Sequence, residues 1–291
     1  MESKEIENQL QKIYPNEKIK KLLEGGMSYA YEIGGKIIRI PKTEYAERGY
    51  ETEKAILDYL HEGTITCTKI PDIKIVREPF FHTVHNKIEG IYWSQKEYLS
   101  KDEKTRDSLA EDCAVFFAQL HSSDLSKINA ELLDLHPIKK NMETYLTEYF
   151  SPSEMEQILK FTDSLFDLGD KVLVHRDFYQ DNFLLTDDYR LNGVLDFGNS
   201  GIYNYMFDFK ALASWEVGMK DFFERISSRY ARITGRIIDI ETIHKIDIHN
   251  YISFLVYFTK NKDVKDEKIG AARHMDEHVA HIKEKMKRYV R

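Results

Sequence analysis

The segment VHRDFYQDNFLL, residues 174–185, places charged and amide side chains within an apolar run that would otherwise read as a strand. A His-Arg-Asp triplet ends at Asp177, Asn182 follows it, and an Asp-Phe-Gly triplet begins at Asp196. Phosphoryl transfer needs a carboxylate that accepts the proton of an attacking hydroxyl and hard oxygen ligands for Mg²⁺. The pattern predicts Asp177 as the base and Asn182 and Asp196 as metal ligands. We expect His175 to support the loop from behind.

A simpler interpretation exists for each of these polar residues taken alone. Asp and Asn side chains often cap turns by bonding to nearby backbone N–H groups. The order and spacing of the whole set nevertheless match the pattern H-R-D-x-x-x-x-N followed by D-F-G, so we favour the catalytic interpretation.

The segment EGGMSYAYEI, residues 24–33, is the candidate phosphate loop. Gly26 and Ser28 lie between two expected strands, where backbone N–H groups and the Ser28 hydroxyl could face phosphate oxygens. An ordinary hairpin turn also favours a pair of glycines, because glycine adopts positive φ at little cost. Both interpretations stay open at this point.

Arg39 is the expected phosphate cation, because arginine stays charged and can fork across two phosphate oxygens. Lys36 points to the opposite face of the alternating strand, and Lys42 lies beyond Pro41. Glu53, on the following helical segment, is expected to pair with Arg39 and fix its direction. An exposed helix carboxylate is the alternative for Glu53.

The connection TVHNKIEGIYW, residues 83–93, is expected to bind the nucleotide base through backbone groups of Asn86, Lys87 and Ile88. This expectation rests on position by analogy with kinases. Nothing in these side chains distinguishes adenine from guanine.

Apolar spacing and turn residues indicate where helices and strands lie. Helical patterns occur at residues 2–14, 45–60 and 106–122 and over most of 205–291, and strand patterns occur within 19–42, 70–77, 80–88, 172–174, 183–185 and 191–197. We therefore expect an α+β protein of two lobes. Residues 1–88 would form a nucleotide-binding lobe with a small antiparallel sheet and a helix, and residues 89–291 a larger, mainly helical catalytic and substrate-binding lobe.

Charge and cysteine content restrict the possible classes of protein. The 291 residues carry a formal net charge of −7, and residues 101–200 hold 20 acidic against 10 basic side chains, so nucleic acids and anionic membranes would be repelled. Cys67 and Cys113 show no metal-ligand spacing, which predicts neither a disulfide framework nor a zinc site. Without an apolar run of the ~20 residues that a bilayer span needs, we expect a cytoplasmic protein.

Four segments together resemble the aminoglycoside phosphotransferases, antibiotic kinases with a two-lobed protein-kinase-like fold. These segments are GGMSYAYEIGGKIIRIPK, LAEDCAVFFAQLHS, LVHRDFYQDNFLL and LNGVLDFGNSGIYNYMFDF, and the resemblance covers residues 20–260. The Arg-x-Pro of the third strand and the Lys-Ile-x-Gly at residues 87–90 are most similar to the branch that modifies the 2″-hydroxyl of gentamicin- and kanamycin-type drugs.

This resemblance implies phosphorylation of a polycationic aminoglycoside, and hence antibiotic resistance, with ATP or GTP as donor and two Mg²⁺ ions as cofactors. It gives the roles described above to the base, the metal ligands and the phosphate cation with its partner. It adds Asp208 as a structural support of the catalytic loop. A monomer or weak dimer is expected.

The sequence departs from the family pattern on the acceptor side. Asn199 stands where the branch commonly has Asp, and Asn204 with Tyr205 replaces its usual Asp-Pro. These changes remove negative charge, whereas a polycationic acceptor requires carboxylates. Asn199, Trp215 and Glu216 are our candidate substrate-contacting residues.

Two alternative functions remain open. A kinase for another small alcohol, of macrolide, choline or sugar type, would keep every catalytic residue and change only the acceptor cleft. A pseudoenzyme that binds nucleotide without turnover is favoured by Arg39 and Asn199. A protein kinase is disfavoured, because its activation segment ends in Ala-Pro-Glu and no proline follows Asp196.

Overall fold

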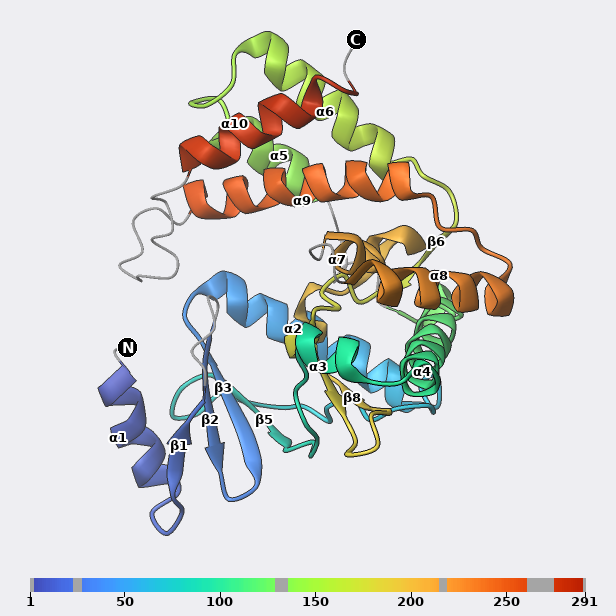
Figure 1. Ribbon diagram of the computed structural model, residues 1–291. Coiled ribbons are helices and arrows are strands. Elements are labelled where there is room, and N and C mark those ends of the chain that lie inside the picture. Colours follow the sequence, from blue (N-terminus) through green and yellow to red (C-terminus); the bar gives the residue numbers. More distant parts are fainter. Residues whose placement is uncertain (1–2, 23–27, 129–135, 215–218, 261–274, 290–291) are drawn as a thin grey trace.

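The structure is a computed structural model that describes residues 3–22, 28–128, 136–214, 219–260 and 275–289. A small sheet forms the N-terminal part of the molecule, and a larger, mainly helical part follows it (Figure 1). This arrangement confirms the expected α+β, two-lobed architecture.

The N-terminal lobe is built on a five-stranded antiparallel sheet in the order β1-β2-β3-β5-β4. Its strands are β1 (Ile19–Lys21), β2 (Ser28–Ile33), β3 (Lys36–Pro41), β4 (Lys74–Val76) and β5 (His82–Asn86). Gly34 and Gly35 join β2 to β3 with positive φ at both positions, the conformation that a tight two-residue hairpin turn needs. β4 and β5 are shorter than the expected strand segments.

Two helices flank this sheet. Helix α1 (Ser3–Ile13) buries Ile6 and Leu10 against apolar side chains of β2 and β3, which makes a small separate core. Helix α2 (Glu44–His61) begins after Thr43, whose hydroxyl accepts a hydrogen bond from the Ala46 N–H at 3.2 Å. The buried side chains Ile56, Leu57 and Leu60 of α2 belong to the core of the larger lobe. α2 therefore packs against both lobes.

The larger lobe is mainly helical in the described part of the chain. Its helices are α3 (Gln95–Ser100), α4 (Glu103–His121), α5 (His136–Tyr145), α6 (Pro152–Phe166), α7 (Lys210–Ser214), α8 (Lys220–Thr234), α9 (Ile240–Lys260) and α10 (Met275–Met286). Two short antiparallel pairs lie among them, β6 (Lys171–Val174) with β9 (Gly201–Asn204) and β7 (Phe183–Leu185) with β8 (Leu191–Val194). Four 3₁₀ turns complete the set: η1 (Leu125–Lys127), η3 (Gln180–Asn182), η4 (Phe197–Asn199) and η5 (Tyr205–Asp208).

The strand expectations differ from the structure at two places. The strand expected at 191–197 ends at Val194, because Asp196 adopts a left-handed conformation with φ of +60° and a 3₁₀ turn follows. Strand β9 has no counterpart among the sequence-based expectations. It forms through pairing with β6, a distant segment, and such pairing leaves little trace in local sequence.

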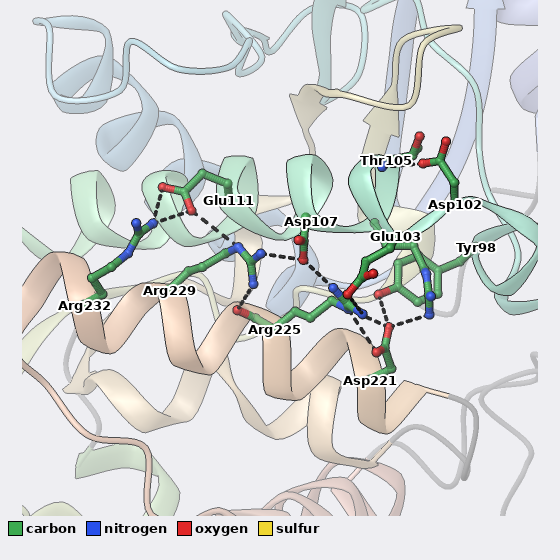
Figure 2. A network of polar contacts seen from close by, with 11 residues as sticks. Tyr98, Asp102, Glu103, Thr105, Asp107, Glu111, Asp221, Arg225, Arg229 and Arg232 are labelled. Atoms are coloured by element: carbon green, nitrogen blue, oxygen red, sulfur yellow. Dashed lines mark hydrogen bonds and ion pairs between the residues drawn. The ribbon is translucent and has the colours of Figure 1, made fainter.

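Helices α4 and α8 lie side by side and carry a row of ion pairs between them (Figure 2). Arg225 of α8 pairs with Asp107 of α4, and Arg229 joins the same carboxylate at 2.5 Å. One turn further along, Arg232 reaches Glu111 at 2.6 Å. Each of these partly exposed pairs contributes little alone, and the row adds to the packing of the two helices.

The lobes meet along the β7–β8 hairpin. The Val194 N–H donates to the carbonyl oxygen of Lys69 at 2.9 Å, and the Lys69 N–H donates to the carbonyl oxygen of Asn192 at 3.1 Å. The division of the chain at residue 88 stays a prediction. None of the helices in the described ranges combines the length and apolar character that crossing a bilayer requires.

A cluster of aromatic rings packs beneath the segment that carries the His-Arg-Asp triplet. The ring of Phe117 in α4 lies 4.7 Å from that of Phe178 and 5.1 Å from that of Phe209, centroid to centroid. All three side chains are fully buried. This segment therefore rests on a rigid apolar base.

We predict that Phe117→Ala lowers the free energy of unfolding by about 3–5 kcal/mol, because it leaves a cavity in this cluster. Urea denaturation measures the loss. Phe254→Ala is the matched control, since Phe254 is 46% exposed and its truncation should cost less than about 1 kcal/mol. Equal losses in the two variants would contradict the packing described.

Candidate active site

The loop after β6 is held by a buried carboxylate. Asp208 accepts hydrogen bonds from the backbone N–H groups of His175, at 3.0 Å, and Arg176, at 2.5 Å. Arg176 has a φ of +66°, a conformation that is unfavourable for a side chain of its kind. Both donors point at one fully enclosed side chain, so Asp208 stabilises this strained turn.

Two further residues hold Asp208 in place. His121, at the end of α4, lies with Nε2 2.9 Å from Asp208 and Nδ1 2.7 Å from the hydroxyl of Tyr230 in α8. An ionised carboxylate can only accept, so Nε2 donates to Asp208 and Nδ1 accepts from Tyr230. Burial raises the pKa of Tyr230 to about 12, so its hydroxyl keeps the proton it donates.

His175 lies behind the loop, as the sequence led us to expect. Its Nδ1 accepts the Asp177 N–H at 3.2 Å and its Nε2 donates to the carbonyl oxygen of Leu195 at 2.9 Å. The imidazole also lies edge-on to Phe197, with ring centroids 4.6 Å apart. Both nitrogens are thus engaged within the protein.

Asp177 lies close to both expected metal ligands. Asn182 donates from Nδ2 to the backbone oxygen of Asp177 at 2.8 Å, and Asn199 donates to its carboxylate at 3.2 Å. Burial, and then the negative charge of Asp196, raise the pKa of Asp177. The three residues singled out by spacing are therefore brought together.

Asn182 and Asp196 suit Mg²⁺ bound jointly with phosphates. The bond from Nδ2 orients the Asn182 amide and leaves its carbonyl oxygen as the metal donor, and the Asp196 carboxylate is half exposed. Among the residues described, no group of three or more His, Cys, Asp or Glu side chains could hold a metal. Mg²⁺ commonly uses one or two protein oxygens and completes its shell with phosphates and water, so this small donor set fits it.

Arg39 and Glu53 form the expected ion pair. Arg39 Nη2 lies 2.5 Å from Glu53 Oε2, and the other Glu53 oxygen accepts the N–H of Phe197 at 3.1 Å. Arg39 Nη1 lies 3.6 Å from Asp196. Burial raises the pKa of Glu53 to about 6 against the opposing effect of Arg39. Burial, the largest influence, lowers the pKa of Arg39, but the combined effects of Glu53, Tyr50 and Asp196 outweigh it and the net shift is upward.

The phosphate-loop candidates are only partly described. Ser28 begins β2, and its side chain hydrogen-bonds Tyr50, whose ring lies 4.7 Å from the guanidinium carbon of Arg39. Ser28 is thus close to the expected phosphate cation. Gly26 lies outside the described residues.

The connection between the lobes has fewer free backbone hydrogen-bonding groups for a nucleotide base than the sequence led us to expect. The Lys87 N–H already donates to the carbonyl oxygen of Gly35 at 2.9 Å, and its ammonium pairs with Glu32 at 3.1 Å. The Asn86 carbonyl oxygen accepts from His85 at 2.9 Å, although its second lone pair remains. Lys87 therefore cannot use its N–H for the base.

The side chain of Ile88 lies over the backbone of β8. A Cβ added to Gly193 would come within 2.7 Å of Ile88 Cγ2, so glycine is required for this close approach. The connection is thereby seated against the β7–β8 hairpin.

Only part of the expected acceptor-binding region lies within the described residues. Asn199 contacts Asp177 as described above, whereas Trp215 and Glu216 lie outside the described residues. Lys210, buried beside the catalytic loop, was not among the expected site residues. The signal available was a single lysine within the apolar run YMFDFKALA, which is unusual because lysine is almost never buried without a partner.

The chain belongs to the phosphotransferase enzyme family, whose model matches residues 19–242. It is therefore a phosphotransferase, and the family resemblance found in the sequence is confirmed.

Similar solved structures share the kinase-like fold. The ADP-bound aminoglycoside phosphotransferase APH(2″)-Ib is 21% identical over 97% of both chains, with a TM-score of 0.72. The gentamicin complex of APH(2″)-IIa is 20% identical over 97% of this chain and 96% of that one, with a TM-score of 0.74. Macrolide 2′-phosphotransferase MphH from Brachybacterium faecium is 17% identical over 91% and 92%, with a TM-score of 0.64. Together these structures confirm the expected fold class.

We predict that Asp208→Asn destabilises the protein by about 1–3 kcal/mol, because one amide oxygen cannot replace two carboxylate oxygens facing several donors. Thermal unfolding followed by circular dichroism measures the change. Asp170→Asn, which loses only a pair with Arg236 at 3.2 Å on a half-exposed side chain, is the control and should stay near wild type. A stable Asp208→Asn variant would contradict the role of this carboxylate in the fold.

We also predict that acid weakens the fold through His249. Burial, followed by the charges of Arg176 and Lys210, lowers the pKa of His249 to about 3. The unfolded chain, with a His pKa near ~6.5, takes up this proton first, so stability falls as pH drops from ~6.5 toward 3. The loss from this group between pH 7.5 and 5 is about 2 kcal/mol. Urea denaturation of wild type and His249→Phe at both pH values should show a smaller acid loss in the variant; equal losses would refute the assignment.

Proposed function

We propose that the protein transfers the γ-phosphoryl group of ATP or GTP, bound with Mg²⁺, to a hydroxyl group of an aminoglycoside. The proposal includes a cytoplasmic location and antibiotic resistance as the result. The observation that carries it is the convergence of Asp177, Asp196 and the buried pair of Arg39 with Glu53 on one site. Chemistry of this kind needs positioning and charge stabilisation more than covalent participation by the protein.

In this mechanism the acceptor hydroxyl lies against the Asp177 carboxylate. As the bond from the acceptor oxygen to the γ-phosphorus forms, the bond to the nucleoside diphosphate breaks, and Asp177 takes the hydroxyl proton. Arg39, directed by Glu53, stabilises negative charge on the phosphate oxygens. Asn182 and Asp196 would hold Mg²⁺, which would supply further neutralisation of the phosphates when bound.

A phosphorylated enzyme intermediate is not part of the proposal. The nucleophile closest to the base would be His175, and its two ring nitrogens are engaged by the Asp177 N–H and the Leu195 carbonyl. Direct transfer between the bound substrates therefore needs no rearrangement of the loop.

Support for an aminoglycoside acceptor comes from the similar structures that contain gentamicin, streptomycin or kanamycin, and from the acidic residues 101–200. A less cationic alcohol, such as a macrolide or a sugar, is the second candidate. It is favoured by the neutral Asn199 on the Asp177 carboxylate and by the ammonium of Lys210 nearby, since both reduce attraction for cations.

A panel of acceptors tests the proposal. Turnover of MgATP or MgGTP by purified protein should rise with kanamycin or gentamicin and not with erythromycin, choline or methylthioribose, and mass spectrometry should show one added phosphate. Stimulation by erythromycin, choline or methylthioribose alone would favour the second candidate. Nucleotide binding without acceptor-stimulated turnover would indicate a pseudoenzyme and reject the proposal.

We predict that Asp177→Asn lowers the acceptor-stimulated kcat by about 10²–10⁴-fold, because the amide cannot accept the hydroxyl proton. Steady-state kinetics give the change, and calorimetry should show the Kd for MgADP within about twofold of wild type. Asp187→Asn, at an exposed aspartate in the turn between β7 and β8, is the matched control. Full activity in Asp177→Asn would remove this residue from the mechanism.

A further inference from the structure

Asn199 donates a hydrogen bond to the side chain of the proposed base. Its Nδ2 lies 3.2 Å from Oδ2 of Asp177, and within the described part of the chain no other side-chain or backbone donor bonds this carboxylate. Each carboxylate oxygen can accept hydrogen bonds of its own. With Oδ2 bonded to Asn199, Oδ1 is the oxygen left to receive a proton from a substrate.

The turn that carries Asn199 is fixed at its first residue. This turn, η4, begins at Phe197, whose N–H donates to the fully buried Glu53 at 3.1 Å. The Ser200 N–H donates back to the Phe197 carbonyl oxygen at 3.0 Å and closes the turn around Asn199. The backbone of Asn199 is therefore placed by the same carboxylate that directs Arg39.

Arg176 holds the other end of this turn. Its Nη1 donates to the hydroxyl of Tyr203 in β9 at 2.8 Å and, over a longer contact of 3.4 Å, to the Asn199 carbonyl oxygen. The guanidinium carbon also lies 4.3 Å from the centroid of the Tyr203 ring, a cation–π distance. Because Arg176 directly precedes Asp177, the proposed base and its amide donor are held by one guanidinium.

Gly201 leaves the space that Tyr203 occupies. A Cβ added at Gly201 would come within 2.6 Å of Cε2 of Tyr203, which is closer than carbon atoms can approach. The Tyr203 side chain is 2% exposed, so the ring has little room to move elsewhere. The place of Arg176, and through it that of Asn199, therefore depends on the absence of a side chain at position 201.

We propose that Asn199 is a positioning residue for phosphoryl transfer: its amide holds Oδ2 of Asp177 and leaves Oδ1 to accept the proton of the acceptor hydroxyl. A neutral amide suits this task, because it donates a hydrogen bond. A carboxylate at the same place could only accept, and it would repel the base. The inference rests on the proposed function, since it concerns the same base. It also gives Asn199 a role other than the substrate contact expected from the sequence.

Asn199→Ala and Asn199→Asp test the inference with kanamycin as acceptor and MgATP as donor. Alanine removes the donor, whereas aspartate keeps the shape and replaces the donor with an acceptor. Both variants should lower kcat by about 10–100-fold through misplacement of the base, and Asn199→Asp at least as much as Asn199→Ala. The KM for kanamycin should stay within about twofold of wild type.

A direct contact between Asn199 and the drug predicts a different result. Asn199→Asp would then add a carboxylate for a polycationic acceptor and lower its KM, with kcat little changed. A change confined to KM, or wild-type kcat in both Asn199 variants, would overturn the inference.

Asn16→Asp is the matched control, because it adds the same charge at an exposed asparagine in the turn between α1 and β1 and should leave kcat unchanged. Tyr203→Phe is a second test, since it keeps the ring but removes the hydroxyl that accepts from Arg176. The loss of one hydrogen bond should lower kcat by about 2–10-fold. Calorimetry should show the Kd for MgADP unchanged in every variant.

Failure of the proposed function is a separate result, because it would appear in the wild-type protein as the absence of transfer to any alcohol of the panel. Crystal structures of wild type and Asn199→Ala then test the inference without turnover. The Asp177 carboxylate should leave its wild-type orientation in the variant. The same orientation in both proteins would overturn the inference.

Discussion

The enclosed carboxylate of Glu53 is the group on which the nucleotide side of the active site depends. A carboxylate without solvent is stable only when donors surround it. Glu53 of α2 finds them in Arg39 of β3 and in the backbone of Phe197, beside Asp196. Three segments far apart in sequence must therefore meet before this charge is satisfied. The distance between Arg39, the proposed phosphate cation, and Asp196, the proposed metal ligand, follows from that requirement.

A second buried carboxylate, Asp208, likewise holds distant segments together, here at the loop that carries Asp177. Its contacts lead outward through His121 to Tyr230, and hence to α4 and α8. The row of ion pairs between these helices runs from the partly buried Arg229 to the exposed Arg232 (Figure 2). The imidazole of His121 therefore connects the packing of α4 and α8 to the catalytic loop that Asp208 holds.

The candidate catalytic residues could be singled out from sequence because the chemistry proposed for them demands particular residue types in a short, ordered span. Asp177, Asn182 and Asp196 needed no knowledge of distant segments. The left-handed turn at Asp196 was missed, since Val194 and Leu195 continue an apolar run and nothing local marks the end of the strand. Lys210 was missed for the opposite reason: its hydrogen-bond partner, Asn250, is on α9, and only the folded chain brings the two together.

The close approach of Ile88 to Gly193 links the size of one side chain to the spacing of the lobes. Any side chain at position 193 would push Ile88 away from β8, and a larger side chain would push it further. The segment expected to contact the base would then lie further from the β7–β8 hairpin, by a distance that increases with the volume of the side chain. The seating of the expected base-binding segment on the hairpin therefore depends on the absence of a side chain at position 193.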